Sequence, residues 1–282
     1  MPERPELDYV VPILHRALTG RRVASVEVLN PVLLRVAMPG DPTALLVGRT
    51  ITGVVRRAHF VRLLTDASPE IAIAPMLAGR FLLCPPSRRV TRDTGLRLGF
   101  EGLDDELRYR DDKQMGKVYL LPHDQLHLAP GLAEVGVDVL APEFTVTRLR
   151  RLGEKRRDQV KLFLLDKAAL DALGNAYADE ALFAAGLHPK RRCSSLSEDE
   201  WARLHAAIVS VLQEATAEVA RRAPPLDAKV RDFLKVRNRK GQPCPVCGSK
   251  IRAAGVRGHD AFFCPRCQPT DTGLVDWRKA GR

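Results

Sequence analysis

Apolar positions are spaced differently in the two halves of the chain. Residues 7–18 repeat apolar side chains at helical spacing, and Thr19-Gly20 follows as a stop signal, so we predict a helix there. From residue 23 to about 121 the pattern changes to short runs of Val, Ile and Leu separated by Gly, Pro or charged residues, which is typical of a β-sandwich or barrel. The predicted strands are 23–28, 50–55, 61–64, 81–83, 96–100 and 117–121.

The second half of the chain has mostly helical periodicity. Helices are predicted over 146–151, 157–169, 179–185 and 197–221, after a proline-containing stretch at 136–144 that marks a domain boundary. From residue 240 onward Gly, Pro and Cys become frequent, as in a small module that is held together by a metal. We therefore expect three domains, at 1–135, 136–235 and 236–282, the last with a C-terminal tail.

Composition favours a globular protein with a polyanionic partner. Of the 282 residues 45% are hydrophobic and 28% charged, which argues against disorder, collagen and coiled coil. The formal net charge of +11 attracts phosphate and makes nucleic acid the first candidate partner, although a generic basic protein has the same balance. No apolar run reaches the roughly 18 residues that a membrane span needs, and the N-terminus lacks signal-peptide features. We expect a cytoplasmic location and no membrane contact.

Four cysteines have the spacing of a metal site. Cys244 and Cys247 form one C-x2-C pair, Cys264 and Cys267 form another, and sixteen residues separate the pairs. Two such turns bring four thiolates to one tetrahedral Zn²⁺, which leaves no open position and so predicts a structural ion. Disulfides or free thiols are the alternatives, and a reducing compartment disfavours the first. Seven Lys or Arg residues lie between 231 and 252. They predict either a surface that binds a phosphate backbone or a basic face that is only solvated.

The start of the chain offers a reactive amine. Removal of Met1 would leave Pro2 with a free secondary amine, and an α-amino group with a pKa of about 7.7–8.0 is partly neutral at physiological pH. Such an amine attacks an aldehyde carbon to form an iminium ion, and Glu3 and Glu6 are nearby carboxylates that can move protons. Taken alone this signal is weak, because many proteins begin Met-Pro.

Three features together resemble a known family. They are the Met-Pro-Glu-x-Pro-Glu start, the segment 174–189 (GNAYADEALFAAGLHP) and the four-cysteine finger. They are similar, in order and over nearly the whole chain, to the formamidopyrimidine-DNA glycosylase / endonuclease VIII family, and closer to its formamidopyrimidine branch. The resemblance implies an α+β fold with an N-terminal helix and β-sandwich domain, a helix–two-turn–helix domain and a zinc-finger hairpin. It also implies a base-excision repair enzyme that flips a damaged base, excises it and cleaves the strand by β,δ-elimination.

The resemblance assigns roles to particular residues. Pro2 matches the nucleophile that attacks the sugar C1′, Glu3 the acid that protonates the ring oxygen, and Glu6 a supporting carboxylate. Three further positions match DNA contacts: Asn175 a phosphate ligand, Lys161 a basic residue of the preceding helix, and Met76 a side chain that fills the space left by the extruded base.

The chain departs from the family at several cationic and wedge positions. His59, in the run 56–60 (RRAHF), stands where the family has a catalytic Lys, and a neutral imidazole is no fixed cation. Lys113 and Met115 replace an Arg and an aromatic wedge in the run 111–116 (DDKQMG). His259 replaces the finger's phosphate-clamping Arg, with Arg257 two residues earlier as a substitute. The loop that caps oxidised guanine is also expected to be missing.

These departures shape the functional expectation. We expect a bifunctional DNA glycosylase and abasic-site lyase that works as a monomer on damaged double-stranded DNA, with one structural Zn²⁺ and a lesion range altered from 8-oxoguanine. The main alternative is a DNA-damage-binding protein on the same scaffold that has lost base excision, and a third is a zinc protein that binds structured RNA. Pro2 and Glu3 favour the enzyme, while His59 and His259 favour the damage-binding protein.

Overall fold

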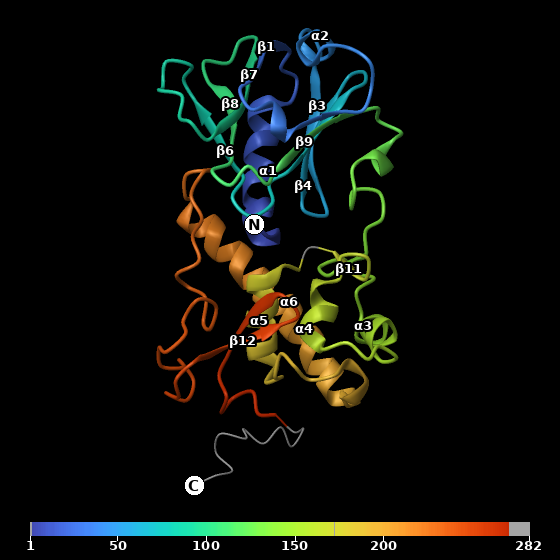
Figure 1. The fold of residues 1–282 in the computed structure, drawn as a ribbon, viewed down its shortest axis with the longest axis vertical. Coiled ribbons are helices and arrows are strands. Elements are labelled where there is room, and N and C mark those ends of the chain that lie inside the picture. The colour runs from blue at the N-terminus through green and yellow to red at the C-terminus, as the bar shows by residue number, and fades with distance from the viewer. Residues whose placement is uncertain (1, 172, 271–282) are drawn as a thin grey trace. The chain divides into compact units, whose positions relative to one another are not determined.

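The computed structural model describes residues 2–171 and 173–270, which divide into two compact units (Figure 1). Unit 1 comprises Met1–Val135 and Ala215–Val230, and unit 2 comprises Gly136–Glu214 and Arg231–Arg282. Met1 and the predicted C-terminal tail, 271–282, lie outside the described residues. Within the described ranges, no helix combines the length and the apolar character that a bilayer span requires.

Unit 1 begins with helix α1, Arg4–Leu18, which starts three residues earlier than the apolar spacing predicts. The early start has a local cause, because Glu3 and Glu6 form a reciprocal capping box at the first turn and Pro5 has a backbone torsion that suits it. One face of the helix is buried in the core of the unit, through Leu7, Val10, Val11, Leu14 and Leu18.

Two sheets, in which most neighbouring strands are antiparallel, make up the rest of unit 1 (Figure 1). The main cluster of buried apolar side chains joins both sheets to α1. One sheet has the order β1-β7-β8-β6 and the other β2-β9-β5-β4-β3. The strands are β1 (Val23–Val28), β2 (Leu34–Val36), β3 (Ile51–Arg57), β4 (Phe60–Thr65), β5 (Glu70–Ala74), β6 (Arg80–Cys84), β7 (Thr94–Phe100), β8 (Glu106–Arg110) and β9 (Lys117–Leu121). Short helices intervene at η1 (Pro31–Leu33), α2 (Pro42–Leu46) and η2 (Leu126–Leu128).

All six predicted strands are present, and three further strands among the described residues of unit 1, β2, β5 and β8, were not predicted. Among these, β8 is buried although its sequence, ELRYR, alternates charged and apolar residues. Its two buried charges are paired, since the Arg108 guanidinium lies 2.5 Å from the Glu106 carboxylate, which also accepts a hydrogen bond of 2.8 Å from Arg97. Although burial opposes ionisation, these hydrogen bonds hold the pKa of Glu106 below its usual value.

Unit 2 is mainly helical and ends in a two-stranded hairpin. Its elements are β10 (Val137–Asp138), α3 (Val146–Gly153), α4 (Val160–Leu165), β11 (Leu170–Asp171), α5 (Asn175–Ala185), η3 (Cys193–Ser195), α6 (Glu198–Arg222, which continues into unit 1), β12 (Arg252–Val256) and β13 (His259–Phe263). The predicted helix 157–169 is too long, because α4 ends at Leu165 and the chain turns at Asp166 into β11. The predicted α+β fold is confirmed, with its sandwich, helical region and finger hairpin.

Candidate functional site

The four cysteines of unit 2 converge on one point. Their sulfur atoms all lie within 4.8 Å of one another, with 3.8 Å between Cys244 and Cys267 and 3.4 Å between Cys247 and Cys264. Four thiolates at about 2.3 Å from a tetrahedral Zn²⁺ would have their sulfur atoms about 3.8 Å apart, so the cluster fits this ion. With four protein ligands the site holds one structural zinc and leaves no position for a reacting water.

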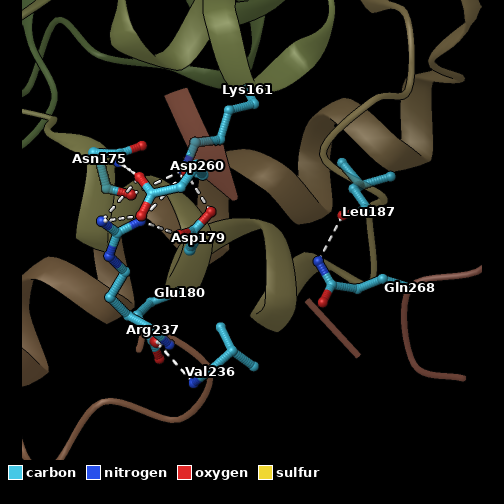
Figure 2. Close-up of polar contacts among 9 residues, drawn as sticks. All are labelled: Lys161, Asn175, Asp179, Glu180, Leu187, Val236, Arg237, Asp260 and Gln268. Atoms are coloured by element: carbon cyan, nitrogen blue, oxygen red, sulfur yellow. Dashed lines mark hydrogen bonds and ion pairs between the residues drawn. The ribbon is translucent and has the colours of Figure 1, made fainter. Parts of the chain in front are cut away.

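The zinc finger is attached to helix α5 by polar contacts (Figure 2). Gln268, just after the last cysteine, donates from Nε2 to the carbonyl of Leu187 at 2.8 Å and accepts from the backbone N–H of Cys264. In the segment that precedes the finger, the backbone N–H groups of residues 235, 236 and 237 donate to the Glu180 carboxylate at 2.7–2.9 Å, and Glu180 is 4% exposed. The segment before the finger is therefore fixed on α5 by one buried acid.

The N-terminal end of α5 carries a cluster of charged side chains, which Figure 2 shows in full. Lys161 is fully buried, and its ammonium donates to Asp179 at 2.5 Å and to the carbonyl of Asn175 at 3.0 Å. Arg237 donates to the other oxygen of Asp179 at 2.9 Å and to both carboxylate oxygens of Asp260 at 3.1 Å. The side-chain amide of Asn175 donates to Asp260 at 2.6 Å.

The ionisation of this cluster follows from burial and pairing. Burial lowers the pKa of Lys161 below its usual value, although Asp179 partly offsets this. The pKa of Asp260 is also low: partial burial opposes ionisation, but the Arg237 charge and the hydrogen bond from Asn175 outweigh it. Asp260 is thus ionised at neutral pH, and its carboxylate accepts hydrogen bonds from both Asn175 and Arg237.

In unit 1, Pro2 lies in the wall of a pocket of about 350 Å³. Glu6 and Tyr9 of α1 line the same pocket, and the segment 224–230 closes one side of it. That segment is held in place, since the Tyr9 hydroxyl donates to the carbonyl of Pro224 at 2.8 Å and Arg110 pairs with Asp227 at 3.1 Å. Apolar side chains make up much of the wall: Leu7, Val10, Leu77, Phe81, Met115, Val219, Leu226 and Val230.

Glu3 and Glu6 follow Pro2 closely in the sequence, and both side chains are buried. The backbone N–H of Glu3 donates to Glu6 at 2.7 Å, and the Glu3 side chain in turn accepts from the backbone of residue 6. Their capping role orients the first turn of α1, and with it the residue that precedes the helix. The chain thus brings Pro2 and two carboxylates to one end of one helix.

The predicted wedge residues lie on a tight turn at the pocket. The buried Asp111 carboxylate accepts the backbone N–H groups of Lys113 at 3.0 Å and Gly116 at 2.6 Å, so that Lys113 and Met115 point outward. Met115 is 44% exposed and lines the pocket together with Lys113. Asp111 is thus the residue that shapes this turn.

His59 and Met76 do not line this pocket in the described part of unit 1. His59 occupies the β3–β4 turn, where its ring contacts that of Phe60 at a centroid distance of 4.6 Å. Met76 has a positive φ of 46° and packs against a small core cluster, whereas its neighbour Leu77 is 58% exposed and lines the pocket. Leu77 is a pocket residue that sequence reasoning missed.

The predicted basic residues of unit 2 have unequal access to solvent. Arg257 lies at the β12–β13 turn with its side chain 76% exposed, and His259 is exposed at the start of β13. Lys161 is buried beneath Asn175, which makes it a support for that residue. Arg237 belongs to the basic run 231–252 and shares the Asp260 carboxylate with Asn175. No local sequence pattern distinguishes it from the other Lys and Arg residues of that run.

Comparison with known proteins gives matches along most of the chain. Residues 1–118 match the model of the formamidopyrimidine-DNA glycosylase N-terminal domain, 135–222 its H2TH domain, and 241–270 the zinc finger found in FPG and IleRS. A formamidopyrimidine-DNA glycosylase of Symbiobacterium thermophilum is 38% identical, over 98% of this chain and 92% of its own length.

Solved structures agree with these matches. The complex of Lactococcus lactis Fpg with abasic-site DNA has a TM-score of 0.85 at 25% identity and covers 95% of this chain and all of its own. A complex of the same enzyme with DNA that contains an oxidised pyrimidine has a TM-score of 0.85 at 26% identity with the same coverage.

Proposed function

The chain belongs to the formamidopyrimidine-DNA glycosylase family, a family of DNA glycosylases with abasic-site lyase activity, and we propose that it excises damaged bases from double-stranded DNA through an iminium intermediate on Pro2. The observation that carries this proposal is the position of Pro2 in the wall of the unit 1 pocket, which Glu6 also lines. A flipped nucleotide in that pocket would present its sugar to the proline nitrogen.

The proposed chemistry uses groups at the start of α1. Once Met1 is removed, the lone pair of the Pro2 nitrogen attacks C1′. The bond from C1′ to the base breaks with its electron pair on the base, which takes up the proton that the Pro2 nitrogen loses. Glu3 protonates the ring oxygen, which opens the sugar and leaves an iminium ion between Pro2 and C1′. Loss of a C2′ proton then expels the 3′ phosphate, and a second elimination expels the 5′ phosphate. Glu6 supports Glu3 through the capping box.

DNA binding is assigned to residues of both units. Asn175, supported by Lys161, contacts a phosphate together with the exposed Arg257 and His259, and Lys113, Met115 and Met76 fill and wedge the space left by the extruded base. In this proposal the protein acts as a monomer in the cytoplasm, with a catalytic part at 1–135, a helix–two-turn–helix part at 136–235 and a finger at 236–282.

We further propose that the lesion range differs from 8-oxoguanine. Apolar contacts dominate the pocket wall, and its closing segment, 224–230, is short and held at Tyr9 and Arg110. His59 provides no fixed cation where the family has a lysine. These features favour pyrimidine, ring-opened or bulky lesions.

Borohydride trapping on a duplex with one abasic site tests the mechanism. The zinc-loaded, untagged protein should give a covalent adduct that maps to Pro2. A form with an N-terminal extension should bind the duplex but give no adduct, and proteolytic removal of the extension to expose Pro2 should restore trapping. Full trapping by the extended form would overturn the role of Pro2. Tight, salt-sensitive binding without any adduct would favour the damage-binding alternative.

A further inference from the structure

The charged cluster at the start of α5 contains an acid at the place where a phosphate is expected. The Asp260 carboxylate accepts a hydrogen bond from the Asn175 amide at 2.6 Å, and both of its oxygens accept from the Arg237 guanidinium at 3.1 Å (Figure 2). Two donors that converge on one anion are what a phosphate oxygen needs. In this structure the protein's own carboxylate takes both donors.

We infer that Asp260 is an internal anion that competes with the DNA phosphate for Asn175 and Arg237, and that Arg237 is a phosphate ligand of this chain. The inference rests on the proposed function, because it takes Asn175 to be a phosphate contact. Asp260 therefore limits the affinity for DNA, and binding requires its carboxylate to give way to the phosphate.

Asp260 is placed to move away. Its side chain is 56% exposed and lies at the second position of β13, next to the β12–β13 turn. Its partners, by contrast, are held without it. Arg237 is also bonded to the fully buried Asp179 at 2.9 Å and lies over the Phe262 ring at 4.9 Å. Asn175 is fixed as the first residue of α5.

Charge within the cluster supports competition. Lys161 and Arg237 carry two positive charges, and Asp179 and Asp260 carry two negative charges, so the four side chains sum to zero. When Asp260 leaves or is neutralised, one positive charge remains beside the Asn175 amide. A phosphate oxygen would then restore neutrality, whereas with Asp260 in place it would meet a like charge.

The expected effect of Asp260→Asn follows from counterion release. The amide keeps an acceptor for Arg237 but removes the charge. The net positive charge that the phosphate meets at this site therefore rises by one, which counts as one more neutralised phosphate. Each neutralised phosphate adds about 0.9 to the slope of log K against log salt for duplex DNA, which at 0.1 M salt corresponds to roughly eightfold tighter binding. A residue that only positioned its neighbours would lower the affinity when changed.

The experiment measures the affinity of the full, zinc-loaded chain for a duplex with a non-cleavable abasic analogue, from 0.05 to 0.3 M salt. Asp260→Asn should bind about eightfold tighter at 0.1 M, with a slope steeper by about 0.9. Asp199→Asn, an equal change of net charge at an exposed position of α6, should leave the slope unchanged. In an Asn175→Ala background the gain from Asp260→Asn should shrink.

Unchanged or weaker binding by Asp260→Asn, with zinc content and unfolding transition as in the wild type, would overturn the inference. If that variant loses zinc, Asp260→Ser removes the same charge and is judged by the same slope. Failure of the proposed function would look different: the wild type would bind the duplex but give no borohydride adduct, or Asn175→Ala would leave binding intact.

Discussion

Glu180 offers a quantitative test of how the finger is attached to the helical part of unit 2. Its carboxylate accepts three backbone N–H groups, those of Lys235, Val236 and Arg237, at 2.7, 2.9 and 2.8 Å. The bond to Val236 is buried, and the other two are partly buried. Glu180→Ala should therefore destabilise unit 2 more than an exposed substitution does.

The magnitude follows from the state of each donor. A buried N–H that loses its only acceptor costs about 1–3 kcal/mol, and a partly buried one that can reach water costs about 1 kcal/mol. For one buried and two partly buried donors the sum is about 3–5 kcal/mol. Glu180→Gln should cost only about 1–2 kcal/mol. Its carbonyl oxygen can serve Val236 and Arg237, as one carboxylate oxygen does now, while its NH2 faces the Lys235 donor.

The assay is urea unfolding of the zinc-loaded chain, followed by the fluorescence of Trp201, which is buried in unit 2. The chain has two tryptophans, so a Trp277→Phe background makes this signal specific. Glu214→Ala, an exposed change on α6, is the control and should stay within about 0.5 kcal/mol. If Glu180→Ala lowers the free energy of unfolding by less than about 1 kcal/mol, or if Glu180→Gln lowers it as much as Glu180→Ala does, these hydrogen bonds do not hold the finger on α5.

Three further predictions concern other parts of the molecule. His59→Lys should raise excision of oxidised purines in a gel-based nicking assay, because it restores a fixed cation; the exposed His127→Lys should not, and no gain on any lesion would refute the role of residue 59. Glu106→Gln should cost about 3–5 kcal/mol at pH 7 in urea unfolding, because it leaves Arg108 buried with a weaker partner. The pKa of Glu106 is depressed in the folded state, so its ionised form stabilises the fold at pH values above the unfolded-state pKa of about 4.3, and this stabilisation is lost as the pH falls through the folded-state pKa. The difference in unfolding free energy between wild type and variant should therefore narrow in acid. A difference that stays constant with pH would contradict this. Chelation should release one Zn²⁺ per chain and weaken DNA binding, measured by a metal-indicator dye and a binding titration, whereas equal binding by metal-free protein would show that the finger does not contribute.

The sequence predicts those elements of the fold whose signal is local. Helix α1, the six expected strands and the long α6 each have an apolar period or a terminal signal within their own residues. Strand β8 could not be found in this way, because its buried charges are paired with Arg97 on another strand, and that pairing exists only in the folded sheet. The helix at 157–169 was predicted too long, because the turn at Asp166 depends on the pairing of β11 with β10.

The same distinction applies to the candidate site. The zinc ligands follow from two short motifs, and the Pro2 hypothesis follows from the first residues of the chain. Arg237 and Asp260 could not be singled out, because they lie 23 residues apart and reach Asn175 from 62 and 85 residues away. Their importance comes from which donors and acceptors meet after folding, and the basic run around Arg237 gives no hint of it.

Two neighbouring acids make this meeting possible. In the sequence Asp179 and Glu180 look like ordinary surface residues of a helix, yet both are buried. Asp179 binds the side chains of Lys161 and Arg237, and Glu180 binds the backbone just before and at Arg237. Together they fix Arg237 beside the first residue of α5.

The net charge of the chain is therefore a poor guide to the phosphate site that we propose at Asn175. A formal charge of +11 attracts DNA over long distances, but the side chains around Asn175 sum to zero as long as Asp260 stays among them. In our proposal, the long-range field governs how fast the chain meets DNA, and the local exchange of one carboxylate for one phosphate governs how tightly this site holds it. Variants that change surface charge elsewhere should thus alter association rates more than dissociation rates, and Asp260→Asn should mainly slow dissociation.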